Sequence, residues 1–209
     1  MLGEYDLTDD IEKLKPIAKP VKKMIVHRDY NPSTFENDIA LLELESPFDM
    51  QPHVVPICLP EKSNENYVGK VAHVAGWGKL SYGKQLYKFV LKEFNTLNIL
   101  LFSGGPIPSI LQVVKLPILA NSQCQQMFLD AGHVKAIRDT FLCAGYPDGG
   151  KDSCEGDSGG PLMMQREDGR WVLIGTVSHG IRCAEPNLPG IYMKTAAFRP
   201  WIDSIIKKK

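Results

Sequence analysis

The hydrophobic residues of this chain fall in short runs separated by turn-forming residues. Six runs rich in Val, Ile, Leu and aromatic residues, bounded by Gly, Pro, Asn or Ser, predict β-strands. They are MIVHRDY (24–30), IALLELE (39–45), KVAHVAGWG (70–78), LQVVKLPIL (111–119), WVLIGTVSHG (171–180) and GIYMKT (190–195). Many short strands of this kind favour an all-β sandwich or barrel.

Helical spacing of apolar residues occurs at two places. One helix is expected after Asn121, in the segment SQCQQMFLDAG, and a second over 196–206 near the end of the chain. Pro200 lies close to the start of the second helix, where a missing N–H is tolerated.

Composition narrows the class of protein. The chain has 209 residues, with 24 basic and 24 acidic ones and a formal net charge of zero, so charge favours neither nucleic acid nor an anionic membrane as partner. Five cysteines without zinc-type spacing favour disulfides and an extracellular location, and no metal. No apolar stretch is long enough to span a bilayer, and the first ten residues do not have the form of a signal peptide. An extracellular protein without an export signal suggests that the chain is incomplete at its N-terminus.

The segment DSCEGDSGGP (152–161) carries the candidate chemistry. Ser158 stands among glycines that permit a sharp turn, which would expose its hydroxyl as a nucleophile. The same turn can aim the backbone N–H groups of Gly156 and Ser158 at one point, where the oxyanion of an acyl-transfer intermediate would lie.

The whole segment resembles the nucleophile segment of trypsin-like, chymotrypsin-fold serine proteases. NDIALL (37–42) is similar to the family segment that carries the catalytic aspartate, here Asp38, and PICLP (56–60) and GWG (76–78) follow in the family's order. Within this family, the chain resembles arthropod clip-domain and Stubble-type proteases.

The resemblance implies an all-β fold, the chymotrypsin-like double β-barrel with a C-terminal helix. Residues 1–60 would be the remnant of an incomplete N-terminal barrel. Residues 61–209 would form the C-terminal barrel and the C-terminal helix.

The resemblance also implies roles for single residues. Ser158 would be the nucleophile, Asp38 the carboxylate that orients a histidine base, and Gly156 and Ser158 the oxyanion-hole donors. Asp157 would pair with the ammonium group released when a zymogen is cleaved.

Substrate preference follows from the position of Asp152, six residues before the serine, where trypsin-like enzymes hold a carboxylate at the pocket floor. This charge would select protein or peptide substrates with Arg or Lys. The remaining substrate-binding residues would be Ser153, Ser178, Gly180 and Gly190. Pro189 matches variants without a sodium site, so neither a cation nor another cofactor is expected.

Two disulfides are implied by the same comparison, Cys124 with Cys143 and Cys154 with Cys183. A third family disulfide is absent on both sides, where Ala72 and Met164 stand instead. Cys58 is left over and would join an upstream segment outside this sequence.

The family's general base lies roughly 45 residues before the aspartate, but only 37 residues precede Asp38. None of the five histidines, His27, His53, His73, His133 and His179, is expected to replace it. His179 occupies the place of a tryptophan that usually lines the substrate cleft, which suggests an altered subsite preference. The sequence also lacks an activation terminus that could pair with Asp157, so the chain by itself is expected to be inactive.

Residues 84–103 have no counterpart in the resemblance. Tyr87, Val90, Leu91, Phe94, Leu97 and Leu101 recur at helical spacing there, which would suit an amphipathic helix used as an exosite or lipid contact. A translated intron is the interpretation we favour, and genomic DNA would decide between the two.

The sequence therefore predicts a secreted trypsin-like serine endopeptidase that cleaves after Arg or Lys. The alternative is a non-catalytic protease homologue that acts as a binding or regulatory module. The upstream transcript separates them, because only the enzyme needs a histidine base there.

Overall fold

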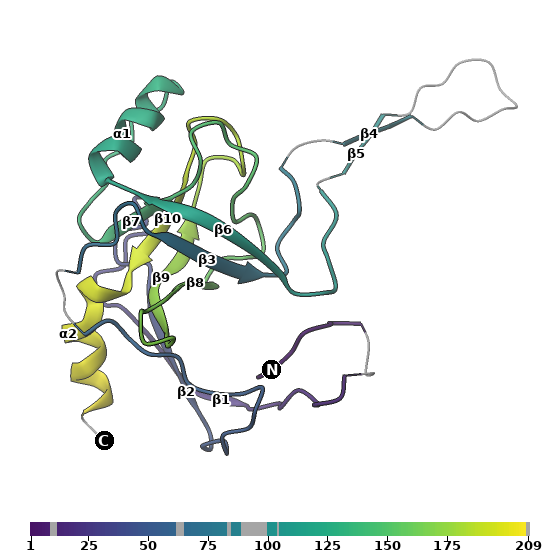
Figure 1. Cartoon of the computed structure of the whole chain (residues 1–209), viewed down its shortest axis with the longest axis vertical. Helices are drawn as coiled ribbons and strands as arrows, with labels where there is room; N and C mark the ends of the chain where they lie inside the picture. Colours follow the sequence, from purple (N-terminus) through teal and green to yellow (C-terminus); the bar gives the residue numbers. More distant parts are fainter. Residues whose placement is uncertain (9–11, 62–64, 83–84, 89–99, 104, 208–209) are drawn as a thin grey trace, which may run out of the picture.

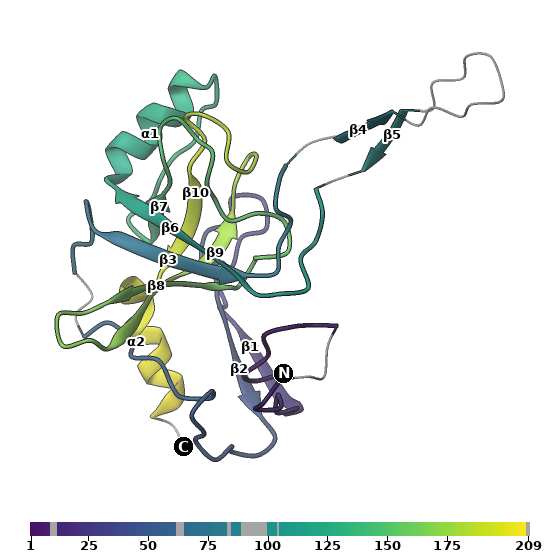
Figure 2. The same cartoon turned by 45° about the vertical axis from the view of Figure 1, so that its right-hand side comes forward.

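Six antiparallel strands close into a barrel in the computed structural model. The structure describes residues 1–8, 12–61, 65–82, 85–88, 100–103 and 105–207, with only the backbone for 85–88 and 100–103. The strands follow the order β10-β7-β6-β3-β8-β9 around the barrel (Figures 1 and 2). They are β3 (Val71–Gly76), β6 (Gln112–Leu119), β7 (Phe141–Ala144), β8 (Pro161–Gln165), β9 (Trp171–His179) and β10 (Gly190–Lys194).

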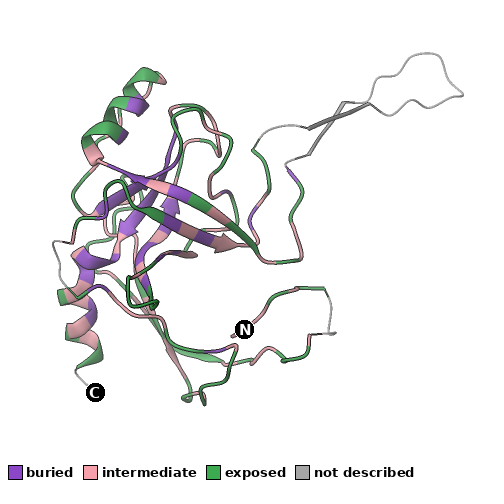
Figure 3. Cartoon of the chain, viewed as in Figure 1, coloured by how far each residue is buried: buried purple, intermediate pink, exposed green. Residues whose placement is uncertain are grey.

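The barrel interior is filled by apolar side chains from every side. Leu116, Ile118, Leu162, Ile174 and Tyr192 are each less than 2% exposed, and buried positions run along the strands in Figure 3. Alternation of buried and less buried residues in β3 and β8 places one face of each strand in this core. Ala72 and Met164 also lie in this core, so apolar packing occupies the place of the family's third disulfide.

A second apolar cluster joins the helices to the barrel. The helices are α1 (Asn121–Asp130) and α2 (Thr195–Ile206). Phe128 of α1 and Phe198 and Ile202 of α2 pack with Phe141 and Met193. These helices are too short to be stable in isolation, so this packing is what holds them.

Two further strands, β1 (Val21–Val26) and β2 (Ala40–Leu44), form a separate antiparallel sheet. Met24 pairs with Leu42 and Val26 with Ala40, so these side chains share one face. Met24 and Leu42 are 64% and 60% exposed. This sheet therefore presents an uncovered apolar face in the described structure.

Residues 84–103, the segment without a counterpart in the resemblance, include two paired strands, β4 (Gln85–Lys88) and β5 (Leu100–Ser103). They project away from the barrel in Figures 1 and 2. The alternative interpretation of this segment, an amphipathic helix, is wrong at its two ends, because Tyr87 and Leu101 are paired positions of an antiparallel ladder and cross-strand pairing supplies the backbone hydrogen bonds. Its central part falls in 89–99, outside the described residues, and the intron interpretation stays a prediction.

The predicted all-β class with a barrel and a C-terminal helix is confirmed, whereas the division at residue 60 stays a prediction. All six expected strands and both helices are present within a few residues of the expected bounds. β7 and β8 were not predicted, because FLCA and PLMMQ are short and show no alternation of apolar and polar residue types, although the side chains of β8 do alternate in burial. No helix in the described ranges is long and apolar enough to cross a membrane.

Candidate active site

Ser158 lies exposed on a tight turn that ends where β8 begins. The N–H of Asp157 donates to the carbonyl of Cys154, and the N–H of Gly160 donates to that of Asp157. Gly156 has φ 101°, a conformation that strongly favours glycine, and an added Cβ would lie 3.1 Å from Gly78 Cα. Glycine is therefore required for both the backbone shape and the space.

The N–H groups of Gly156 and Ser158 find no acceptor among the residues that the structure describes. By contrast, the N–H groups of Asp157, Gly159 and Gly160 are all bound to backbone carbonyls. The two donors expected to hold an oxyanion are thus the ones that remain available to a ligand.

The carboxylate of Asp157 stabilises the turn through two hydrogen bonds. Its Oδ1 accepts from the N–H of Gly78 at 2.8 Å, and its Oδ2 accepts from the N–H of Cys154 at 2.9 Å. A Cβ at Gly76 would lie 2.0 Å from the same carboxylate, and one at Gly78 2.4 Å. The GWG segment therefore leaves room for this acid only because it lacks side chains at both positions.

Asp152 and Ser158 line one cavity of about 300 Å³. The carboxylate of Asp152 accepts N–H groups from Ser153 at 2.8 Å and Ala184 at 3.2 Å. Burial nevertheless raises the pKa of Asp152 to about 7, since desolvation outweighs these two donors. No cationic side chain forms an ion pair with Asp152 within the described ranges, so a cationic ligand would relieve the cost of burying its charge.

Gly190 and Gly180 also line this cavity, together with Ser153 and Ser178. A Cβ at Gly190 would lie 2.7 Å from Asp152 Oδ1, whereas one at Gly180 would meet nothing closer than 3.6 Å. Ser153 Oγ lies 3.0 Å from the buried Tyr192 hydroxyl. The five residues predicted to bind substrate are thus brought together.

Asp38 reaches the cavity through Ser178, whose hydroxyl donates to Asp38 Oδ2 at 2.7 Å. Val177 pairs with Tyr192 and His179 with Ile191, so Ser178 is the extra residue of a β-bulge in β9. The bulge leaves Val177 and Ser178 both buried. Sequence reasoning named both Asp38 and Ser178 but did not foresee their hydrogen bond, because 140 residues separate them.

His179 continues this network. The single hydroxyl proton of Ser178 is used toward Asp38, so the 3.0 Å contact between Ser178 Oγ and His179 Nδ1 requires Nδ1–H to donate. His179 is then neutral with its lone pair on Nε2, an atom that is buried and without a hydrogen-bond partner in the described structure. Burial and the charge of Lys135 lower the pKa of His179 to about 4, in keeping with a neutral ring.

The other four histidines are engaged elsewhere. His27 packs against Phe198 and Trp201 of α2, and His53 Nε2 contacts the carbonyl of Lys15. His73 lies edge-on to Trp171 in the barrel wall, and the N–H of His133 donates to Phe128 in the turn after α1. None of the five histidines hydrogen-bonds Asp38, whose described side-chain partner is Ser178.

Both predicted disulfides are present, Cys124–Cys143 and Cys154–Cys183. The second joins the serine turn to the loop that supplies the Ala184 N–H to Asp152. Cys58 is a free, partly buried thiol.

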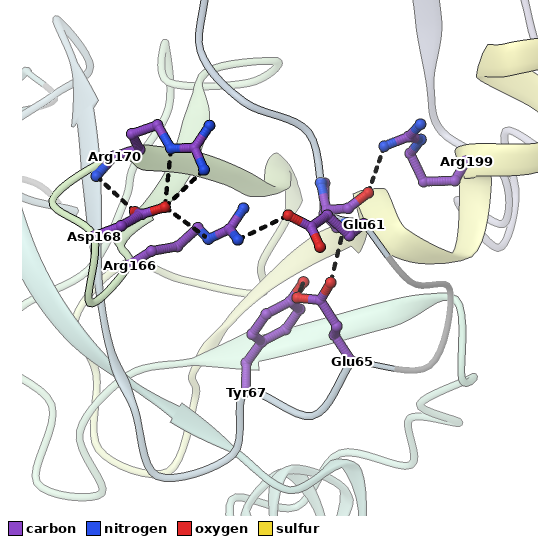
Figure 4. A network of polar contacts seen from close by, with 8 residues as sticks. Glu61, Glu65, Tyr67, Arg166, Asp168, Arg170 and Arg199 are labelled. Carbon is purple, nitrogen blue, oxygen red and sulfur yellow. Dashed lines mark hydrogen bonds and ion pairs between the residues drawn. The ribbon is translucent and has the colours of Figure 1, made fainter.

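A larger cavity, of about 790 Å³, lies away from these residues. Arg166 bridges Glu61 at 2.7 Å and Asp168 at 3.9 Å, Arg170 also binds Asp168, and the Tyr67 hydroxyl donates to Glu65 (Figure 4). Several of its charged groups are thus paired with one another, and it contains none of the predicted catalytic residues. The smaller cavity beside Ser158 is therefore the candidate active site.

Comparisons with known proteins show what this chain is similar to. The family model described as Trypsin matches residues 2–99 and 100–202. Serine protease filzig of Drosophila melanogaster is 51% identical over 98% of this chain, and serine proteinase stubble of the same fly is 45% identical over 96%. A venom protease of Bombus pensylvanicus is 36% identical over 98% of the chain. The matched regions span 11%, 23% and 73% of these three relatives.

Proposed function

The chain belongs to the trypsin family of serine proteases, and from this premise we propose that its site serves an endopeptidase that cleaves after Arg or Lys. The observation that carries the proposal is the shared cavity of Asp152 and Ser158, to which Asp38 is tied through Ser178. A buried carboxylate without a cationic partner favours a substrate with a positive side chain over a neutral one.

In the proposed reaction, Ser158 Oγ attacks the carbonyl carbon of the scissile bond. Its proton passes to a histidine base, and the carbonyl oxygen becomes an oxyanion bound by the N–H groups of Gly156 and Ser158. The base then protonates the leaving amine as the C–N bond breaks, which leaves an acyl-enzyme for water to hydrolyse.

The 209 residues do not supply this base in the described arrangement. His179 comes nearest, but its Nδ1–H is committed to Ser178 and its Nε2 is buried. A serine hydroxyl without a base is a weak nucleophile. We therefore propose that this polypeptide by itself binds substrate side chains without turning them over.

Benzamidine, a planar cation, tests the cavity without requiring turnover. We expect calorimetry to show saturable binding to the chain, and Asp152→Asn to weaken it at least about a hundredfold, because the variant removes a partly buried charge pair. Equal affinity for the two proteins would contradict the assignment of Asp152.

A fluorophosphonate probe tests the nucleophile, since it reacts with activated serines. We expect no labelling of the chain above the level of Ser158→Ala. Labelling that depends on Ser158 would show that a base is present within these residues, and would overturn only the proposal of inactivity.

Two further roles belong to the same proposal. Asp157 receives hydrogen bonds from two backbone N–H groups and lies against glycines, and its carboxylate would form an ion pair with the ammonium group of an activated chain end.

The disulfides suit a secreted protein, and Cys58 would form a disulfide with an upstream segment.

A further inference from the structure

The cavity beside Ser158 is bordered by an aromatic pair that the proposed reaction does not use. Phe35 and His179 both line it, with ring centroids 4.6 Å apart and planes at 22°. Phe141 supports His179 edge-on at 5.8 Å. The imidazole adds surface but no charge at neutral pH, because burial and the charge of Lys135 lower the pKa of His179 to about 4.

The ammonium group of a lysine lies beside this aromatic pair. Lys135 Nζ lies 6.0 Å from the centroid of the Phe35 ring, and its charge acts on His179. The side chain is partly buried, and burial lowers the pKa of Lys135. No carboxylate lies within ion-pair distance of it among the residues that the structure describes. A partly buried ammonium with only a ring face beside it retains most of its capacity to bind an anion.

The loop that carries Phe35 is held in a costly conformation. Phe35 has a φ of 58°, which bulky residues rarely adopt, and Asn37 has a φ of 57°, which asparagine tolerates better than most residues. Hydrogen bonds from Phe35 N–H to Asn31 and from Asn37 Nδ2 to Asp29 hold the loop, and Arg138 binds Glu36 at 2.9 Å. The ring is thus fixed beside the cavity rather than free to cover or leave it.

Resting on the proposed function, we propose that Lys135 is a specificity-determining residue that selects an acidic side chain in the substrate, close in sequence to the Arg or Lys bound by Asp152. Asp152 then provides a negative group inside the cavity, and Lys135 provides a positive group outside it, beside the Phe35 ring that lines its border, so that together they favour peptides with both charges. Arg182 lines the cavity itself, but it is exposed, so water already solvates its charge and a pair with it gains little.

Peptide binding to the 209-residue chain tests this. The test uses alanine peptides, acetylated and amidated at their ends, that contain a single Arg. Each peptide carries one Asp, placed one, two or three residues before or after the Arg. A control peptide with Asn in place of that Asp accompanies each one. We expect at least one Asp peptide to bind about tenfold tighter than its Asn control at low salt, and the preference to shrink as salt rises. Lys135→Met is expected to abolish the preference while leaving benzamidine affinity unchanged. Lys23→Met, an exposed lysine of β1, is the matched control and should keep it.

Other outcomes overturn the inference in distinguishable ways. Arg-dependent binding without any preference for Asp contradicts the role of Lys135 alone. A preference that survives Lys135→Met and is lost in Arg182→Gln assigns the selection to Arg182 instead. If the unmodified chain binds neither benzamidine nor the Arg peptides, the proposed function is contradicted, and the inference with it.

Discussion

Asp152 shows how one residue can serve binding at the expense of stability. Two backbone N–H groups orient its carboxylate, yet desolvation still dominates and raises its pKa to about 7. An acid that is more easily ionised in the unfolded chain than in the folded one destabilises the fold when the solution is neutral. A ligand cation would recover that cost, which couples substrate binding to stability.

The pH dependence of stability follows from this shift. Because the folded pKa of about 7 exceeds the ordinary value of 3.8, the unfolded chain binds fewer protons between these limits, and stability falls as pH rises through them. Asp152→Asn removes the effect. Urea unfolding should show a stability difference in favour of the variant that grows from about pH 4 to about pH 7 and is constant above. A difference that is independent of pH would contradict the raised pKa.

The two cavity glycines should respond differently to a methyl group. Gly190→Ala places a Cβ 2.7 Å from Asp152 Oδ1, so we expect a loss of about 1–3 kcal/mol in stability and at least about tenfold in benzamidine affinity. Gly180→Ala, whose Cβ makes only an ordinary contact, should change stability by less than about 0.5 kcal/mol. Thermal unfolding and calorimetry measure both effects, and a reversed order would be inconsistent with this geometry.

At the scale of elements, β9 and the serine turn form the site by departing from regular structure. The bulge at Ser178 directs its hydroxyl to Asp38, and the turn at 154–160 leaves two N–H groups without acceptors. The turn could be expected from its glycines, but the bulge is not visible in the sequence of β9, because it is defined by the register of β9 against β10. Ser178 could be named beforehand only through the family resemblance.

The two disulfides connect different elements and should have different consequences. Cysteine-to-serine replacement of either pair is expected to cost about 3–4 kcal/mol, since the closed loops have 19 and 29 residues. Loss of Cys154–Cys183 should also weaken benzamidine binding at least about tenfold, because it frees the loop that holds Asp152. Loss of Cys124–Cys143 should leave that affinity unchanged. Calorimetry on the two double variants, under conditions where both remain folded, decides the point.

For the molecule as a whole, the barrel and the β1–β2 sheet differ in how well they are covered. The barrel closes on itself and leaves few unpaired edges, whereas Met24, Val26 and Leu42 stand exposed on one sheet face. Contiguous apolar surface of this kind promotes association.

Sedimentation velocity should therefore show self-association that increases with concentration. Replacement of Met24 and Leu42 by Lys is expected to reduce it, since burying charged side chains opposes the contact. The same replacements at Leu80 and Val134, two exposed apolar residues outside this sheet, should have little effect. Association that persists in the first variant would show that another surface is responsible.

By itself, the sequence determined the barrel strands with clear hydrophobic patterning, both helices, and the residue types of a serine protease site. These depend on local periodicity and on a ten-residue motif, which act over short stretches of chain. It did not identify β7 or β8, whose patterns are too short, and it misjudged Tyr87 and Leu101, whose spacing fits a helix while their pairing makes a hairpin. Only the tertiary structure decided that Asp38 meets Ser178, that His179 is neutral and donates to it, and that Lys135 stands beside Phe35 without a described carboxylate partner. These features arise between residues far apart in the chain, and their charges depend on burial, which no local pattern specifies.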